Sequence, residues 1–180
     1  MKFNKEIHVE GKLISSMSPT FVIAEAGVNH GGNMFFAKKL IDLAVEAKAD
    51  AVKFQTFKAE HLILSNIQKA PYQKNTTDAN ETQFNMLKKL EVSKDQNIEL
   101  KQYCIKKDII FLTTPFDEES LKEINELDLP AYKVASTDTT NLPFLKKIAK
   151  RGKPIFLSTG MSYLSEVRRA LETIYKYNKN

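Results

Sequence analysis

The sequence lacks the features that hold small secreted domains together or anchor a protein in a membrane. Cys104 is the only cysteine among the 180 residues, which excludes an internal disulfide and is typical of a reducing compartment. Its place in a helical pattern predicts a packing role. No apolar stretch approaches the roughly 18 residues of a membrane helix, and residues 1–10 contain no apolar signal-peptide core. We therefore expect a cytoplasmic protein that does not interact with a membrane.

The composition also lacks a strong bias toward one charge. There are 27 basic and 22 acidic residues, a formal net charge of +5, and 42% hydrophobic residues, a balance typical of one soluble globular domain with a sizeable core. Many basic residues lie on predicted helical faces, as in Lys146–Lys153, without interleaved aromatic side chains. This pattern indicates a solvated surface and not a nucleic-acid interface, although a modest positive field favours anionic substrates.

Five short strand-like runs are each followed by a helical pattern, the second only after a long loop over residues 58–80. The runs are Phe21–Gly27, Ala51–Phe57, Ile109–Phe116, Ala131–Thr137 and Pro154–Gly160. This alternation predicts an α/β fold of the parallel TIM (β/α) barrel type. A closed barrel needs eight such units over about 250 residues. We therefore expect residues 1–180 to be an incomplete barrel: an excerpt, a natural truncation, or a chain completed by partners.

Local signals place the ends of several elements. Two short strands over residues 6–9 and 12–14 are expected to form a hairpin ahead of the barrel. The N-cap residues expected for four of the helices are Ser93 or Asp95, Asp117, Asn141 and Ser162.

The second run alternates strictly between apolar and polar side chains. If Val52, Phe54 and Thr56 pack against helices, Lys53 and Gln55 point into the barrel. A register slip of one residue would reverse this assignment.

Polar side chains stand at the carboxyl ends of the runs, where barrel enzymes carry their chemistry. A lysine buried in a strand is unfavourable unless an anion meets it, and two runs carry one. The residues that could form an anion clamp through charge-assisted hydrogen bonds are Lys53, Gln55, Thr114, Lys133, Ser136 and Ser158. The other interpretation is that the two lysines form buried structural ion pairs with Glu25 and Asp138.

Two carboxylates and one histidine near the strand ends also have two interpretations each. Glu25 and Asp138 could act in acid–base chemistry or orient a sugar hydroxyl, but Asp138 also fits a simple turn. His30 is favoured as a tight-turn residue over a metal ligand, since the other two histidines show no ligand spacing with it. Gly31 and Gly32 precede a helix but lack the full pattern of a phosphate loop.

Five segments occur in the order and spacing of a known family. They are Ile23–His30, Ala51–Phe57, Phe111–Phe116, Tyr132–Ser136 and Leu157–Met161. Through them the chain resembles the sialic acid synthases, including N-acetylneuraminate and legionaminic acid synthases, over nearly its whole length. Five collinear motifs are far more specific than any one of them.

This resemblance implies a TIM-barrel enzyme that condenses phosphoenolpyruvate with an N-acetylated mannose-type sugar and releases phosphate. By motif, it implies that phosphoenolpyruvate is held by Lys53, Thr114, Lys133, Ser136 and Ser158. Glu25 and Gln55 would line the reacting centre, and Asp138 would contact the sugar or an intermediate. Asn75, in the long loop, would correspond to a sugar-binding asparagine of the family.

The resemblance also implies parts that these residues do not contain. The cofactor would be a divalent metal, Mn²⁺ or Mg²⁺, but the family's histidine ligands lie on later strands. Its C-terminal antifreeze-like domain, through which a homodimer forms, also lies outside residues 1–180. Thr137 replaces the family's usual glycine, so we expect the loop carrying Asp138 to differ from that of the family. We therefore expect no turnover from these residues alone.

Two rival functions stay open. One is a different phospho-sugar aldolase on the same fold, with Lys53 or Lys133 as a Schiff base. The other is a non-catalytic remnant or assembly partner that pairs through its open strand edges.

Overall fold

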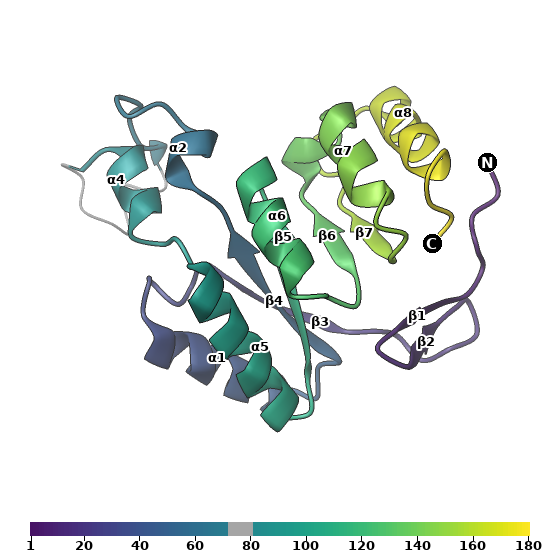
Figure 1. The fold of residues 1–180 in the computed structure, drawn as a ribbon, viewed down its shortest axis with the longest axis horizontal. Helices are drawn as coiled ribbons and strands as arrows, with labels where there is room; N and C mark the ends of the chain where they lie inside the picture. The colour runs from purple at the N-terminus through teal and green to yellow at the C-terminus, as the bar shows by residue number, and fades with distance from the viewer. Residues whose placement is uncertain (72–80) are drawn as a thin grey trace.

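The computed structural model describes residues 1–71 and 81–180 and alternates strands with helices along the chain (Figure 1). The strands of the barrel wall are β3 (Ile23–Gly27), β4 (Ala51–Thr56), β5 (Ile110–Pro115), β6 (Tyr132–Val134) and β7 (Ile155–Leu157). The helices are α1 (Met34–Glu46), α2 (Ala59–Leu62), α4 (Gln83–Lys88), α5 (Lys94–Lys106), α6 (Glu118–Glu126), α7 (Leu142–Ala149) and α8 (Leu164–Tyr175). Each predicted run contains one of these strands, so the predicted alternation is confirmed.

The wall is parallel but divided into two sheets. One sheet has the order β3-β4-β5 and the other pairs β6 with β7. The expected barrel is therefore present as an open α/β wall, not closed among the described residues, with β6 beside β5 but outside its ladder (Figure 1). The last two strands are shorter than their runs, and after β6 the chain enters a 3-10 turn, η1, at Ser136–Asp138.

A hairpin precedes the wall, as expected. Strands β1 (Ile7–Val9) and β2 (Lys12–Ile14) pair antiparallel. Glu10 and Gly11 between them have φ of 50° and 82°, the double positive φ of the tight turns that match strand twist.

The inward face of the wall begins with an apolar layer. Ala51, Ile110, Leu112 and Ala131 are buried together with Val9 of the hairpin. The stacked rings of Phe21 and Phe156, with centroids 6.0 Å apart, lie at the same end. The hairpin therefore helps to cover the amino-terminal end of the strands with packed side chains.

The outward face of the wall packs on the helices. Val52 and Phe54 are fully buried in the main core with Ile41 of α1 and with Leu100 and Cys104 of α5. This confirms the predicted register of β4, since the alternate residues must then face inward. It also confirms packing for Cys104, and its burial raises the pKa of the thiol to about 12.

The helix starts follow the expected N-caps with one exception. Ser93, Asp117 and Asn141 each accept a backbone hydrogen bond from the first turn of their helix. The expectation for Ser162 is wrong: α8 is capped at Tyr163, whose backbone N–H donates to the Glu166 carboxylate at 2.7 Å. None of the helices in the described ranges is long and apolar enough to span a bilayer.

Candidate functional site

Above the apolar layer, the inward positions toward the carboxyl ends of the strands become polar. Lys53 on β4 is buried, with 6% exposure, and its Nζ lies 2.6 Å from Glu25 Oε2 on the neighbouring strand β3. The same ammonium donates to Thr114 Oγ1 on β5 at 3.4 Å. The ladder pairs Glu25 with Lys53 directly. Three adjacent strands therefore bring a carboxylate, an ammonium and a hydroxyl into one polar group.

Lys133 on β6 faces the same space. Its Nζ donates to Val134 O at 2.9 Å. Burial lowers the pKa of Lys133, the positive charge of Lys53 lowers it further, and Glu25 opposes both effects. The two ammonium groups therefore repel each other across the wall, while the Glu25 side chain near them is half exposed. An anion between them would relieve this repulsion.

The structural ion-pair interpretation holds for one lysine only. Lys53 does pair with Glu25. Asp138 instead accepts a hydrogen bond from Asn141 Nδ2 at 3.2 Å, and no ion pair joins it to Lys133 among the described residues. Lys133 is left as the less compensated charge, which favours an anion site.

Gln55 lies beside Glu25 at a bend in β3. The β3–β4 register shifts between Glu25 and Gly27, and Gly27 has a φ of +55°. A Cβ on Gly27 would lie 3.0 Å from Glu25 Oε1 and 3.5 Å from Gln55 Nε2. Glycine therefore gives these two polar side chains room to approach the same point.

The serines and Asp138 come from the ends of β6 and β7. Ser136 opens the 3-10 turn, and its Oγ would lie 3.5 Å from a Cβ at Gly160. Ser158 donates its backbone N–H to Val134 O at 3.1 Å. Asp138 is buried, and burial raises the pKa of its carboxyl while the hydrogen bond from Asn141 opposes this. The two serines therefore lie at the ends of the paired strands β6 and β7. The remaining predicted residue, Asn75, lies outside the described residues.

His30 is a turn residue, as favoured from the sequence. Its Nδ1 accepts the Gly32 backbone N–H at 3.0 Å, and its ring is buried, 6.1 Å from the Phe54 ring centroid. Burial lowers its pKa.

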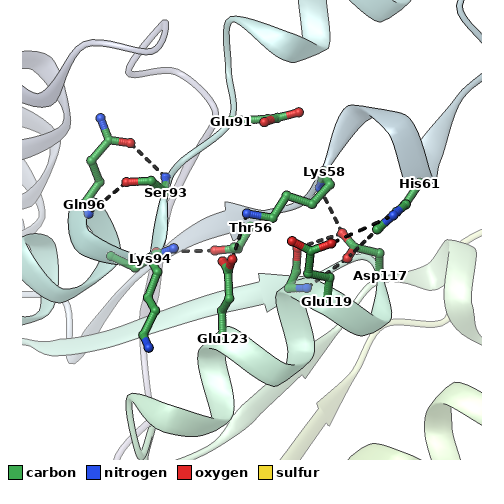
Figure 2. Close-up of polar contacts among 12 residues, drawn as sticks. Thr56, Lys58, His61, Glu91, Ser93, Lys94, Gln96, Asp117, Glu119 and Glu123 are labelled. Carbon is green, nitrogen blue, oxygen red and sulfur yellow. Dashed lines mark hydrogen bonds and ion pairs between the residues drawn. The ribbon is translucent and has the colours of Figure 1, made fainter.

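From the sequence, Asp117 is predicted only to cap a helix, but its carboxylate has further partners in the structure (Figure 2). Its carboxylate accepts hydrogen bonds from the Lys58 backbone N–H at 2.9 Å and from Ser120 N–H at 2.8 Å. His61 Nδ1 lies 3.3 Å from its Oδ1, and Lys58 Nζ pairs with Glu123 at 2.8 Å. No spacing in the sequence signals these contacts, because they depend on which loop residues lie opposite one another.

The described residues do not offer a metal site. Within ranges 1–71 and 81–180, no three His, Cys, Asp or Glu side chains are grouped so that they could hold an ion. The donor set does not fit the divalent metal that the resemblance implies, so no chemical step is assigned to one here.

Comparisons with known proteins show the family of this chain. A sequence model of the NeuB family matches residues 40–180. The chain is 50% identical to N,N'-diacetyllegionaminic acid synthase of Campylobacter jejuni over 89% of its length, and 44% identical to the enzyme of the same name from Legionella pneumophila over 92%. It covers 48% and 46% of those proteins. The chain therefore spans about half the length of these curated relatives.

Among solved structures, the fold matches N-acetylneuraminic acid synthetase of Leptospira borgpetersenii, with a TM-score of 0.82 and 32% identity. That match covers 98% of this chain and 57% of the other. The open α/β wall is therefore similar to part of a larger synthase.

Proposed function

Because the chain belongs to the NeuB family, we propose that it supplies the phosphoenolpyruvate-binding part of a nonulosonic acid synthase. The reaction would join phosphoenolpyruvate to an N-acetylated mannose-type sugar. The enol carbon forms a bond to the aldehyde carbon of the open-chain sugar, water adds to the resulting cation, and cleavage of the carbon–oxygen bond releases phosphate. The product is a sialic-acid-like nonulosonic acid.

The observation that carries this proposal is the convergence of a carboxylate, a buried ammonium and a hydroxyl from three adjacent strands, Glu25, Lys53 and Thr114, with Lys133 near enough to Lys53 and Glu25 for their charges to act on its pKa. Formally, two ammonium groups and the Glu25 carboxylate leave one positive charge in the space that they share. Phosphoenolpyruvate carries a phosphate and a carboxylate, so it can meet both lysines with charge-assisted hydrogen bonds. Thr114, on the next strand, adds a hydroxyl within 3.4 Å of Lys53.

The remaining residues have roles that follow from their places around these lysines. We propose that Ser136 and Ser158 donate hydroxyls to the anion. Glu25 and Gln55 would line the reacting centre beside the Gly27 bend. Asp138, whose pKa is raised by burial, would contact the sugar or an intermediate. Asn75 keeps its proposed sugar contact.

The direct test is release of phosphate by the complete gene product that contains these residues. It would be incubated with phosphoenolpyruvate, a divalent metal salt and a panel of N-acetylated hexoses that includes N-acetylmannosamine. We expect phosphate release that requires both substrates. No release with any N-acetylated hexose would refute the proposal.

One observation favours a second candidate, an aldolase that forms a Schiff base. Such enzymes need a lysine whose pKa is lowered, and burial lowers that of Lys133. Borohydride treatment with a carbonyl substrate would then trap a covalent adduct on this lysine. The synthase proposal expects none, since its phosphoenolpyruvate lysines act only as charged donors.

A further inference from the structure

Just beyond the parallel ladder between β4 and β5, a backbone N–H donates to a side chain instead of a backbone carbonyl. Its last backbone hydrogen bond runs from the Phe116 N–H to Thr56 O, at 3.1 Å. Two residues beyond Thr56, the Lys58 N–H donates to the carboxylate of Asp117 at 2.9 Å. This carboxylate oxygen therefore adds one hydrogen bond between the two chain segments just beyond the ends of β4 and β5.

Both oxygens of Asp117 accept hydrogen bonds from Ser120, but only Oδ2 also accepts the Lys58 N–H. Oδ1 accepts the Ser120 N–H at 2.8 Å, which caps α6, and faces His61 Nδ1 at 3.3 Å. Oδ2 accepts the Lys58 N–H and the Ser120 hydroxyl, the latter at 2.7 Å. Burial alone would raise the pKa of Asp117, but these hydrogen bonds outweigh it and lower the pKa. The carboxylate is therefore fixed in both orientation and charge.

A helix cap does not need the second oxygen. Asparagine and serine cap helices about as well as aspartate, and either could accept the Ser120 N–H. The bond from Oδ2 to Lys58 connects α6 to the start of the loop after β4, as Figure 2 shows. The Lys58–Asp117 bond lies a few residues beyond the pair formed by Gln55 and Thr114. Both of these residues belong to the proposed site.

We propose that Asp117 is a positioning residue for phosphoenolpyruvate, which holds the ends of β4 and β5 in register through the hydrogen bond from Lys58. The inference rests on the proposed function, because the ladder that ends beside this bond carries Lys53, Gln55 and Thr114. Loss of this hydrogen bond would let the strand ends separate. Misplacement of binding groups by about 1 Å can reduce rates by up to about 100-fold.

Two substitutions test the Lys58–Asp117 hydrogen bond separately from the capping of α6 by Asp117. Asp117→Asn has one acceptor oxygen, and since asparagine is a strong N-cap residue we expect it to keep the Ser120 N–H and lose the Lys58 N–H. Asp117→Ser is too short to reach Lys58 while it caps α6. The matched control is Ser93→Ala, which removes the N-cap of α5 without touching the β4–β5 ladder.

All variants would be made in the complete gene product. We would measure KM for phosphoenolpyruvate, KM for the sugar, kcat, the melting temperature, and deuterium exchange of the peptides that cover residues 53–61 and 118–126. Both Asp117 variants should raise KM for phosphoenolpyruvate about tenfold and leave KM for the sugar within twofold. Exchange should increase over 53–61 and stay unchanged over 118–126. Ser93→Ala should lower the melting temperature without changing either KM.

The outcomes distinguish two failures. If the unmodified protein neither turns over nor binds phosphoenolpyruvate by calorimetry, the proposed function fails, and the role of Asp117 in it fails too. If the unmodified protein is active but both Asp117 variants keep its KM for phosphoenolpyruvate, Asp117 is only a helix cap and the inference is wrong.

Discussion

Replacement of Lys53 by methionine should separate binding from stability. Methionine keeps a long unbranched side chain but removes the charge that lies 2.6 Å from Glu25. Replacing a buried ion pair with apolar groups is often neutral or stabilising, by about 1–4 kcal/mol, whereas removing one partner is strongly destabilising when the other stays buried. Here the side chain of Glu25 is 53% exposed and can be hydrated. We therefore expect the free energy of unfolding to change by no more than about 1 kcal/mol.

Affinity for phosphoenolpyruvate should fall much further. A hydrogen bond to a charged group contributes about 1.5–3 kcal/mol, which corresponds to a loss of about 10- to 100-fold in affinity. Calorimetric titration of phosphoenolpyruvate into the complete gene product gives the dissociation constant, and thermal or urea unfolding gives the stability.

The matched control for Lys53→Met is Lys38→Met. Lys38 also makes a 2.6 Å ion pair, with Glu99, but on the outer surface of α1 and α5. The Lys38→Met variant loses the same charge and should keep the full affinity for phosphoenolpyruvate. The reasoning is refuted if Lys53→Met binds phosphoenolpyruvate normally, or if it loses several kcal/mol of stability.

Three further predictions concern residues around the wall. Burial raises the pKa of Asp138 above its usual 3.8, so the folded protein binds that proton more tightly than the unfolded chain, and the associated stability is lost as pH rises through the raised pKa. Asp138→Asn should therefore raise the melting temperature at pH 7 and raise it less at pH 4. The Cys104 thiol, fully buried and with a pKa of about 12, should not react with a disulfide reagent at pH 8 until the protein unfolds. Gly31→Ala and Gly32→Ala both place alanine at positive φ, which costs about 1–2 kcal/mol. Only the second also brings a Cβ to 2.1 Å from the Lys89 carbonyl oxygen, so it should destabilise the protein by at least about 1 kcal/mol more.

Each of these has a clear contrary result. An equal rise in melting temperature for Asp138→Asn at pH 7 and at pH 4 would show that the charge of Asp138 does not destabilise the folded protein. Rapid labelling of native Cys104 would show that the core around it opens easily. Equal effects of the two glycine substitutions would show that the loop carrying Lys89 moves away without penalty.

Local signals in the sequence were sufficient where an element depends on its own residues. The alternation through Val52, Lys53 and Phe54 was sufficient to identify the face of β4 that packs on the helices. Asp117 and Asn141 were identifiable as caps because their side chains bond within the same first turn. At α8 the same rule failed, because the Glu166 side chain reaches back to Tyr163 and moves the start of the helix by one residue.

Contacts between distant segments could not be derived in this way. The break between β5 and β6 is one such feature: the three residues of β6 pair with β7 and not with β5, and no local pattern in the sequence indicates which neighbour a strand pairs with. The bond from Lys58 to Asp117 joins residues 59 positions apart. Likewise, the sequence left the clamp and the ion pair as alternatives for Lys53, and its partner is set by the β3–β4 register.

The two layers of the inward face give a physical reason for the proposal that the two lysines bind an anion. The apolar layer that includes Ile110 and Leu112 fills the space on the amino-terminal side, so the ammonium groups of Lys53 and Lys133 lie over packed hydrocarbon. Charges interact more strongly there than in water. Glu25 offsets part of the repulsion but is itself half exposed. A second carboxylate in that space would stabilise the empty protein more, and it would also repel the phosphate. The incomplete compensation of Lys133 is therefore the physical reason to expect an anion at this position.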